Sequence, residues 1–439
     1  AFVDAQTEYL VVDKDTAAVT WAKDKSSIDN GTDIQAFANA AGKYAKEHDA
    51  IKANYEKKAT GKNGVSAAEN NTTSITFNNL PLGWYLVVSD LNNGAICSID
   101  TTDPDAIIKE KNGEPTIDKY VDNDKSNDAG IGDKVNFQID VAVLDGQPHD
   151  YVIHDAMSDG LDFNNDIVVY LYDSVDEFVS SGFNGSFDFN KAKLDPTKYD
   201  ITLNPTGCID HSNCTFKIAF KENVLKPNNI IIVKYSATVN ANAVIGVKNG
   251  NPNEAILEYD NNPKTKRSTT TTYVWEMGVH KFANLGDKKE DTPLKDAEFQ
   301  LYKDVVDSKN NTTTTMYAIF SNGTPSKDGT SVYKLTSWTE TASQATTVVT
   351  PEKGNIQFVG LDAGTYYLKE TKAPTGYNKL TAPIKVEISS TLPTAGGVAS
   401  YTVTYGENSD EANDGHIIPV ENKTGTVLPS TGGIGTTLF

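Results

Sequence analysis

A short segment near the end of the sequence has the residue types of a peptide that a transpeptidase could cut. Its five residues are Leu428, Pro429, Ser430, Thr431 and Gly432. The ring of Pro429 fixes φ and disfavours helix in the residue before it, so we expect an extended and accessible segment. An attacking cysteine could take the Thr431 carbonyl as acyl donor, with Gly432 on the leaving side. The sequence therefore predicts a covalent joining site here.

This pentapeptide resembles the sorting signal that sortases recognise in Gram-positive surface proteins. In precursors of that family an apolar helix and a basic tail follow the signal, whereas here a short Gly-rich tail runs to Phe439. We expect those segments, and a leader ahead of Ala1, to lie outside this sequence. The resemblance implies a secreted protein that is displayed on the cell surface and anchored to the cell wall.

Three stretches in the last third of the chain resemble the collagen-adhesin B-type domain of Gram-positive surface proteins. They are VHKF at 279–282, YYLKETKAPTGY at 366–377 and PVENK at 419–423. The resemblance implies that Lys281 on the first strand forms an intramolecular isopeptide bond with Asn422 on the last strand. Glu370 would assist the reaction.

Such a bond needs these residue types in a buried place. An amide carbon is a poor electrophile, and a protonated lysine is no nucleophile. Burial lowers the pKa of the lysine and raises that of the carboxyl, so a neutral amine can face a protonated acid that polarises the amide oxygen. Folding then holds amine and carbonyl in contact. The alternative is a buried ion pair of Lys281 and Glu370, with Asn422 as a hydrogen-bonding neighbour and no covalent bond.

The middle of the chain has a related pattern, which resembles the middle domain of Gram-positive backbone pilins. The stretches are TIDKYV at 116–121, YVIHDAMSDGL at 151–161 and NEAILEY at 253–259. By that resemblance Lys119 would bond to Asn253, with Asp155 as the assisting acid. Asn249 and Asn251 lie close in sequence, so the identity of the acceptor asparagine stays open. The alternative for Lys119 is an ordinary lysine at the edge of the core that forms no crosslink.

The first part of the chain contains NLPLGWYLVV at 79–88, which echoes 360–369, but Val88 stands where the acid should be. We therefore predict no crosslink there. Backbone pilins also have an acceptor lysine near the junction of their first two domains. Lys111 is the best match and Lys109 the second choice, although the aromatic, valine and Tyr-Pro positions of the family motif are absent. The alternative for both is a solvated charge in a linker.

Length, charge and composition predict the elements that must position these groups. A chain of 439 residues should divide into about three domains. A formal net charge of -20 argues against binding to nucleic acid. Asn, Asp, Thr, Gly and Tyr are plentiful, which is typical of short strands joined by turns. We predict an all-β chain of three tandem immunoglobulin-like β-sandwich domains in a rod, the first with an added helix.

The expected domains cover 1–113, 114–272 and 273–427, followed by the sorting signal and residual tail at 428–439. We expect the helix over about 33–58, because apolar residues recur there at helical spacing. Alternating apolar residues from Val135 to Val141 predict a strand with one buried face. The polar stretch 261–272 is expected to be an exposed linker.

The remaining reactive groups are few. Cys208 and Cys214 flank a short polar segment that a disulfide could close, as suits an exported protein. Cys97 is left over and is expected to be a small buried apolar side chain. No Cys/His cluster has metal-ligand spacing and no glycine loop follows a strand, so we predict no metal and no cofactor. A solvated acidic face is favoured over a calcium site for Asp122, Asp124 and Asp128.

The resemblance implies the structural backbone subunit of a covalently polymerised pilus, not an enzyme. Its partners would be pilus-type and housekeeping sortases, identical subunits, accessory pilins and peptidoglycan, with host surface ligands as a further class. One alternative is a cell-wall-anchored monomeric adhesin or pilus-tip protein that uses the same domains. Another is a secreted enzyme with an unfamiliar site.

Overall fold

The structure of the chain is a computed structural model. From 115 to 425 it describes all residues except 144–147, 183–191, 207, 209–213, 260–263, 285–290, 308–309, 394–397, 407 and 411–415. Before 115 it describes 10–16, 19–21, 37–38, 40–45, 48, 50–56, 76–88, 95–99, 101, 104–106 and 108.

A sandwich of two sheets forms the middle of the molecule. One sheet has the order β10-β13-β7-β5, with β9 beside β13, and the other has the order β11-β12-β8-β14-β15-β6. The strands of the first sheet are β5 (Thr116–Val121), β7 (Lys134–Ala142), β9 (Leu161–Phe163), β10 (Val168–Tyr172) and β13 (Ile230–Val239). Those of the second are β6 (Ser126–Asp128), β8 (Val152–Met157), β11 (Tyr199–Leu203), β12 (Phe216–Phe220), β14 (Asn251–Glu258) and β15 (Ser268–Tyr273).

Period-2 alternation builds the core of this sandwich. Along β7 every second residue from Val135 to Val141 is buried, as the sequence predicted. Helix α3 (Val175–Gly182) and the short 3-10 helix η3 (Pro196–Lys198) interrupt the strands. Asp195 caps η3 by accepting a hydrogen bond from the Thr197 N–H at 2.8 Å.

A second sandwich follows at once, and its strands form one hydrogen-bonded path from β17 to β27. Its first strand, β16 (Trp275–Ala283), pairs with β23 (Asn355–Leu361) and runs parallel to the last strand, β28 (Ile417–Glu421). The other long strands are β18 (Glu298–Asp307), β19 (Thr312–Phe320), β21 (Ser331–Thr339), β24 (Gly364–Lys372), β25 (Ile384–Thr391) and β26 (Ser400–Tyr405). The short elements are β17 (Thr292–Pro293), β20 (Thr324–Pro325), β22 (Val348–Val349), β27 (Asn408–Asp410) and the 3-10 helix η4 (Ala342–Gln344).

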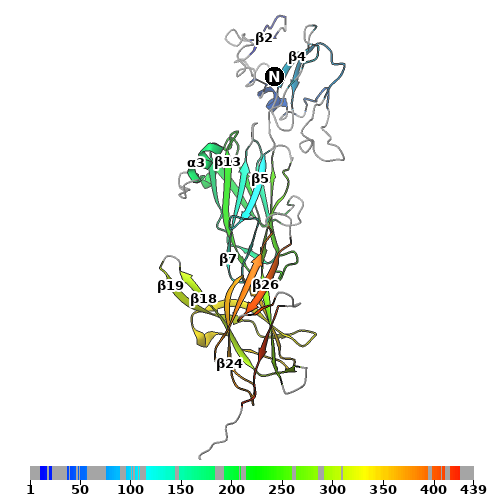
Figure 1. Ribbon diagram of the computed structural model, residues 1–439. Helices are drawn as coiled ribbons and strands as arrows, with labels where there is room; N and C mark the ends of the chain where they lie inside the picture. Colours follow the sequence, from blue (N-terminus) through cyan, green and yellow to red (C-terminus); the bar gives the residue numbers. More distant parts are fainter. Residues whose placement is uncertain are drawn as a thin grey trace, which may run out of the picture.

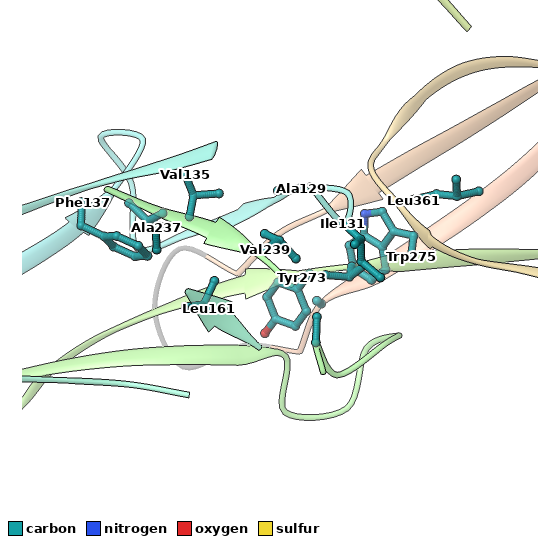
Figure 2. Packing of buried hydrophobic residues seen from close by; sticks show 14 of the residues in the cluster. Ala129, Ile131, Val135, Phe137, Leu161, Ala237, Val239, Tyr273, Trp275 and Leu361 are labelled. Carbon is teal, nitrogen blue, oxygen red and sulfur yellow. The ribbon is translucent and has the colours of Figure 1, made fainter. Parts of the chain in front are cut away.

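The two sandwiches are stacked end to end and share a single hydrophobic core (Figure 1). Figure 2 shows Ile131 and Tyr273 of the middle sandwich packed near Trp275 and Leu361 of the next one. The Ile131 N–H donates to the Gly360 carbonyl at 2.9 Å, so backbone hydrogen bonding also crosses the junction. The shared core and the backbone contact restrict bending between the two units.

The expected linker at 261–272 is wrong for its second half. Residues Ser268–Tyr273 form β15, which pairs antiparallel to β14 and parallel to β6, and Thr270 and Thr272 are buried. A run of threonines is polar, but it is also β-branched and suits a pleated surface. Its propensity to form a strand, rather than its polarity, decides the structure here.

The first part of the chain contributes two strand pairs at the end beyond the middle sandwich (Figure 1). These are β1 (Leu10–Val12) with β2 (Val19–Trp21), and β3 (Gly83–Val87) with β4 (Ala95–Ile99). The described residues of 37–45 are helical, whereas 51–56 are exposed and not helical. The helix predicted to reach 58 is therefore too long, because the apolar stripe that could bury a face ends near Ala45.

The prediction of an all-β chain is confirmed for the part that the structure describes. Within that part, no helix has the length and apolar character needed to cross a membrane.

Candidate functional site

The second sandwich brings together the three residues that the sequence analysis selected in its last third. Lys281 occupies an inward position of β16, between Val279 and Ala283 in the alternation. Asn422 follows β28 directly, and its N–H donates to the Phe282 carbonyl at 3.0 Å. Because β28 runs parallel to β16, with Val420 opposite Lys281, the amide side chain meets the lysine.

Glu370 completes this cluster from the facing sheet, at an inward position of β24. Its Oε1 lies 3.4 Å from Lys281 Nζ, and its Oε2 accepts from Asn422 Nδ2 at 3.2 Å. The Asn378 carbonyl accepts from the same Nδ2 at 2.9 Å, which orients the amide. The side chains of Lys281 and Glu370 are both 0% exposed.

Burial lowers the pKa of Lys281, and the nearby carboxylates of Glu370 and Glu421 offset this only in part. Asn422 Oδ1 is buried without a hydrogen-bond partner among the described residues. A buried amide oxygen that lacks a donor is costly, and a carboxyl group that holds a proton would satisfy it. The cluster therefore has an amine biased toward its neutral form beside an amide and an acid.

The middle sandwich contains a second cluster of the same types. Lys119 lies on β5 at an inward position between Ile117 and Val121, and it is fully buried. Asp155 on β8 and Asn253 on β14 approach it from the other sheet, both also fully buried. The three residues selected from the sequence thus meet in the space between the sheets.

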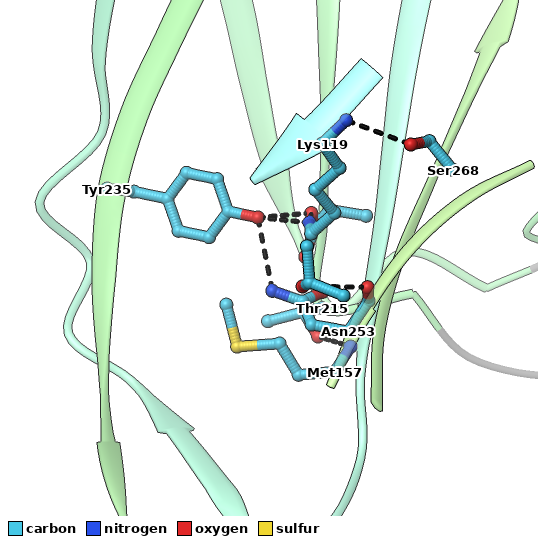
Figure 3. A network of polar contacts seen from close by, with 8 residues as sticks. Lys119, Met157, Thr215, Tyr235, Asn253 and Ser268 are labelled. Atoms are coloured by element: carbon cyan, nitrogen blue, oxygen red, sulfur yellow. Dashed lines mark hydrogen bonds and ion pairs between the residues drawn. The ribbon is translucent and has the colours of Figure 1, made fainter. Parts of the chain in front are cut away.

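A residue that the sequence analysis did not select, Tyr235, joins these three groups (Figure 3). Lys119 Nζ donates to Asp155 Oδ2 and to Tyr235 Oη in short contacts. Tyr235 Oη donates to Asp155 Oδ2 at 2.5 Å and accepts from Asn253 Nδ2 at 3.2 Å. Tyr235 lies on β13, whose run of apolar residues offered no signal for a polar role.

Burial shifts both partners of the central ion pair toward their neutral forms. It lowers the pKa of Lys119, against the opposing effect of Asp155, and it raises the pKa of Asp155, against the opposing effect of Lys119. Burial and the Asp155 carboxylate hold the pKa of Tyr235 well above its ordinary value. The site therefore biases the amine, the acid and the phenol toward their neutral forms.

The alternative acceptors in the middle domain lie elsewhere. Asn251 is buried, but its amide is engaged with the backbone of Val244, at 2.8 Å and 3.1 Å, and of Thr272, at 3.1 Å. Asn249 is exposed in a turn with φ of 69°. Of the three asparagines that the sequence left open, Asn253 is the one that touches the cluster.

Cys208 and Cys214 form a disulfide, as predicted, with their Cα atoms 5.6 Å apart. The ring of His154 lies beside it, with Nδ1 3.6 Å from Cys208 Sγ and Nε2 3.0 Å from Glu258 Oε2. These two sulfurs and the imidazole have the spacing of a metal site. A disulfide has no thiolate to offer, so the group is structural in this state.

Two smaller expectations are corrected. Cys97 on β4 is half-buried rather than fully buried. Asp128 does not simply face solvent, since it accepts hydrogen bonds from Ser390 Oγ and, at 3.3 Å, from the Ala363 N–H across the junction. Asp128 lies where the two sandwiches meet, so it contacts the next domain. The expectation of a solvated acidic face did not include this contact.

Several predicted sites lie outside the described residues. These are the sorting signal at 428–432 and both candidate acceptor lysines, Lys111 and Lys109.

Comparisons with known proteins found similarity to surface and pilus proteins of streptococci. Residues 280–396 match the family model of SpaA, described as a prealbumin-like fold domain. The chain is 27% identical over 266 residues to the trypsin-resistant surface T6 protein of Streptococcus pyogenes serotype M6. That match covers 56% of this chain and 42% of the T6 protein, so it spans less than half of the relative's length.

Solved structures of pilus proteins also match this chain. The T6 backbone pilin of Streptococcus pyogenes serotype M6 matches with 16% identity and a TM-score of 0.49, over 95% of this chain and 94% of that chain. The pilus 2b backbone protein of group B streptococcus matches with 21% identity and a TM-score of 0.44, over 72% of this chain and all of that chain. In sequence the chain is similar to the streptococcal T6 surface protein, and its residues 280–396 are similar to the SpaA prealbumin-like fold domain.

Proposed function

We propose that this chain is the structural backbone subunit of a covalently polymerised Gram-positive pilus, stiffened by internal Lys-Asn isopeptide bonds. The observation that carries the proposal is the repeated cluster of buried lysine, carboxyl group and asparagine, once in each of two consecutive sandwiches. A buried ion pair alone rarely stabilises a fold relative to apolar residues, so two such clusters ask for another explanation.

In the second sandwich, proton transfer within the ion pair leaves a neutral Lys281 amine and a protonated Glu370. The amine nitrogen attacks Cγ of Asn422 while Glu370 gives its proton to the amide oxygen, which forms a tetrahedral intermediate. Glu370 then takes a proton from Nζ and passes it to Nδ2. The Cγ–Nδ2 bond breaks, ammonia leaves, and the hydroxyl proton returns to Glu370. Glu370 therefore ends as the protonated acid that took part in the attack, with the proton that it received from the Lys281 ammonium.

The middle cluster would react in the same way, with Lys119 as nucleophile, Asn253 as acceptor and Asp155 as the acid. Its crosslink would join β5 of one sheet to β14 of the other. The fold supplies the effective concentration that a lysine and an amide lack in solution.

Mechanical strength is the expected benefit. A bond from Lys281 to Asn422 would tie the first strand of the sandwich to its parallel neighbour, the last strand. Tension that enters at β16 and leaves at β28 would then pass through a covalent link instead of shearing the hydrogen bonds between them. The two sandwiches also share a core, so the joint between them would resist bending.

Polymerisation would use the two ends of the subunit. A pilus-type sortase would cleave after Thr431 and join its carbonyl to a lysine of the next subunit, with Lys111 favoured over Lys109. A housekeeping sortase would attach the finished polymer to peptidoglycan, which places the protein on the cell surface. Accessory pilins and host surface ligands would be further partners, and the chain itself would not be an enzyme beyond its own crosslinking.

The first test is the intact mass of the reduced protein, followed by mapping of crosslinked peptides by tandem mass spectrometry. The proposal predicts a deficit of two ammonia molecules, with Lys281 joined to Asn422 and Lys119 joined to Asn253. In each of the variants Asn422→Ala and Asn253→Ala, the measured mass should fall below the mass calculated from the sequence by one ammonia instead of two. An unmodified mass would refute the crosslinks and leave a sandwich protein with a sorting signal.

The main alternative is a wall-anchored monomeric adhesin or pilus-tip protein built from the same domains. Such a protein would contain the crosslinks and the sorting signal but would lack an acceptor lysine. Incubation with a purified pilus sortase separates the two, since only a backbone subunit should yield a ladder of covalent multimers.

A further inference from the structure

The two crosslinking clusters differ in how the acid reaches the asparagine. In the second sandwich, Glu370 contacts both Lys281 Nζ and Asn422 Nδ2 with its own two oxygens. In the middle sandwich, Asp155 contacts Lys119, but the described hydrogen bonds of Asn253 Nδ2 lead to Tyr235 and not to Asp155. An aspartate is one methylene shorter than a glutamate, and the phenol of Tyr235 fills the remaining gap.

Tyr235 is unusual because its hydroxyl touches the nucleophile, the acid and the leaving nitrogen at once. It accepts from Lys119 Nζ, donates to Asp155 Oδ2 at 2.5 Å, and accepts from Asn253 Nδ2 at 3.2 Å. The ring is 4% exposed and is held by Phe137, with ring centroids 5.4 Å apart, and by Phe216, at 5.0 Å. This packing holds the hydroxyl in place, and Figure 3 shows its hydrogen bond with Asn253.

We propose that Tyr235 is a further catalytic residue of the middle-domain crosslink, which relays a proton from Lys119 Nζ to the Nδ2 that leaves Asn253. The inference rests on the proposed crosslinking function. It adds Tyr235 to the reacting groups of the middle cluster, whereas in the second cluster Glu370 alone contacts both the lysine and the asparagine.

The relay balances as follows. Attack of Nζ on Cγ of Asn253 leaves two protons on a positively charged Nζ, while Asp155 protonates the amide oxygen. Tyr235 Oη accepts one proton from Nζ and gives its own proton to Nδ2, since a hydroxyl hydrogen can rotate toward a new acceptor. The Cγ–Nδ2 bond breaks and ammonia leaves. The hydroxyl proton of the intermediate returns to Asp155, so tyrosine and aspartic acid are both regenerated.

The electrostatics of the site suit a relay rather than a base. Because burial and Asp155 hold the pKa of Tyr235 well above its ordinary value, the phenol stays un-ionised. A neutral hydroxyl can accept and donate in one concerted event without placing a net charge in the core.

The test follows bond formation in Tyr235→Phe, which keeps the ring and removes the hydroxyl. Full-length chain recovered in denaturant from inclusion bodies has not folded, so refolding starts the reaction, and intact mass is recorded over time. Tyr199→Phe is the matched control, because Tyr199 is a buried tyrosine of the same sandwich that packs on Phe220. The crosslink between Lys281 and Asn422 is an internal control for folding in every sample.

We expect wild type and Tyr199→Phe to lose two ammonia molecules. Tyr235→Phe should lose one promptly, from the second sandwich, and the other about a hundredfold more slowly, which is the lower end of the usual effect of a lost proton-transfer group. Equal rates in Tyr235→Phe and the control would overturn the relay and leave the crosslinks standing. If the wild type itself loses no ammonia from the middle domain, the proposed crosslink falls together with the relay.

A second measurement covers the case in which Tyr235→Phe does not fold. Replacing Tyr235 by 3-fluorotyrosine keeps the hydroxyl and the shape but makes the phenol more acidic. A proton relay predicts a changed rate and a shifted pH profile for the middle crosslink alone. A residue that serves only in packing predicts no change in either, and that result would overturn the inference.

Discussion

Removing the proposed crosslink of the second sandwich should cost a large part of the stability of that sandwich. The appropriate variant is Lys281→Met together with Glu370→Gln. The single change at Lys281 would leave a buried carboxylate without a positive charge beside it, which typically costs a further 3 to 5 kcal/mol by itself. Glutamine keeps an acceptor for the Leu380 N–H, which donates to Glu370 Oε2 at 2.7 Å in the native protein.

The magnitude follows from the length of chain that the bond closes. With the chain-entropy relation used for disulfides, a loop from Lys281 to Asn422 corresponds to about 5 kcal/mol. For a domain of this size each kcal/mol shifts the melting temperature by about 2 to 4 °C, so we expect a decrease of about 10 to 20 °C.

Differential scanning calorimetry of wild type and the double variant measures this shift, and intact mass confirms that one ammonia is retained. Lys372→Met with Glu298→Gln is the matched control, because this pair lies in the same sandwich with a 2.9 Å contact while the Lys372 side chain is 64% exposed. An exposed pair is screened by solvent, so this control should melt close to wild type. A double variant that retains one more ammonia yet melts within about 2 °C of wild type would refute the reasoning from loop length.

Three further predictions concern other parts of the chain. Replacing Cys208 and Cys214 by serine should destabilise the middle sandwich by about 2 kcal/mol, the value for such a short loop, as measured by urea unfolding against wild type with the disulfide intact. Burial raises the pKa of Asp140 to about 6, so its ionisation opposes folding, and the free energy of unfolding should fall as pH rises from about 4 to 6. In urea unfolding, Asp140→Asn should add up to about 3 kcal/mol of stability at pH 8 and little at pH 4. Equal gains at both pH values would contradict this assignment. Lys111→Ala should abolish multimer formation by a purified pilus sortase, whereas Lys109→Ala should not. If the single variant Lys111→Ala still forms a ladder of multimers, the acceptor is another lysine.

Much of the fold could be predicted because its signals are local. The alternation from Val135 to Val141 gave one face of β7, and the recurrence of turn residues indicated short strands. The threonine run in β15 was missed because polarity and β-branching point in opposite directions, and pairing with β14 and β6 decides between them. The helix was drawn too long because its apolar stripe ends near Ala45, and the described residues 51–56 after it are exposed.

The candidate sites were only partly accessible from the sequence. Hydropathy alone would place Lys119 and Lys281 on the surface, since lysine is seldom fully buried. Their selection depended on motifs that resemble a known family, and the structure places both lysines at inward positions of their strands. Tyr235 offered no such motif, because an aromatic residue in an apolar strand is the expected filling of a core.

The sequence by itself determined the strand-rich class, the predicted disulfide and the residue types that could crosslink, because each depends on composition or on neighbours along the chain. Only the tertiary structure decided which asparagine faces Lys119, which hydroxyl joins Asp155 to Asn253, and that the two sandwiches share a core. Those contacts join residues far apart in sequence across facing sheets. Strand register and sheet stacking set the distances between them, and neither is visible in a single strand's pattern.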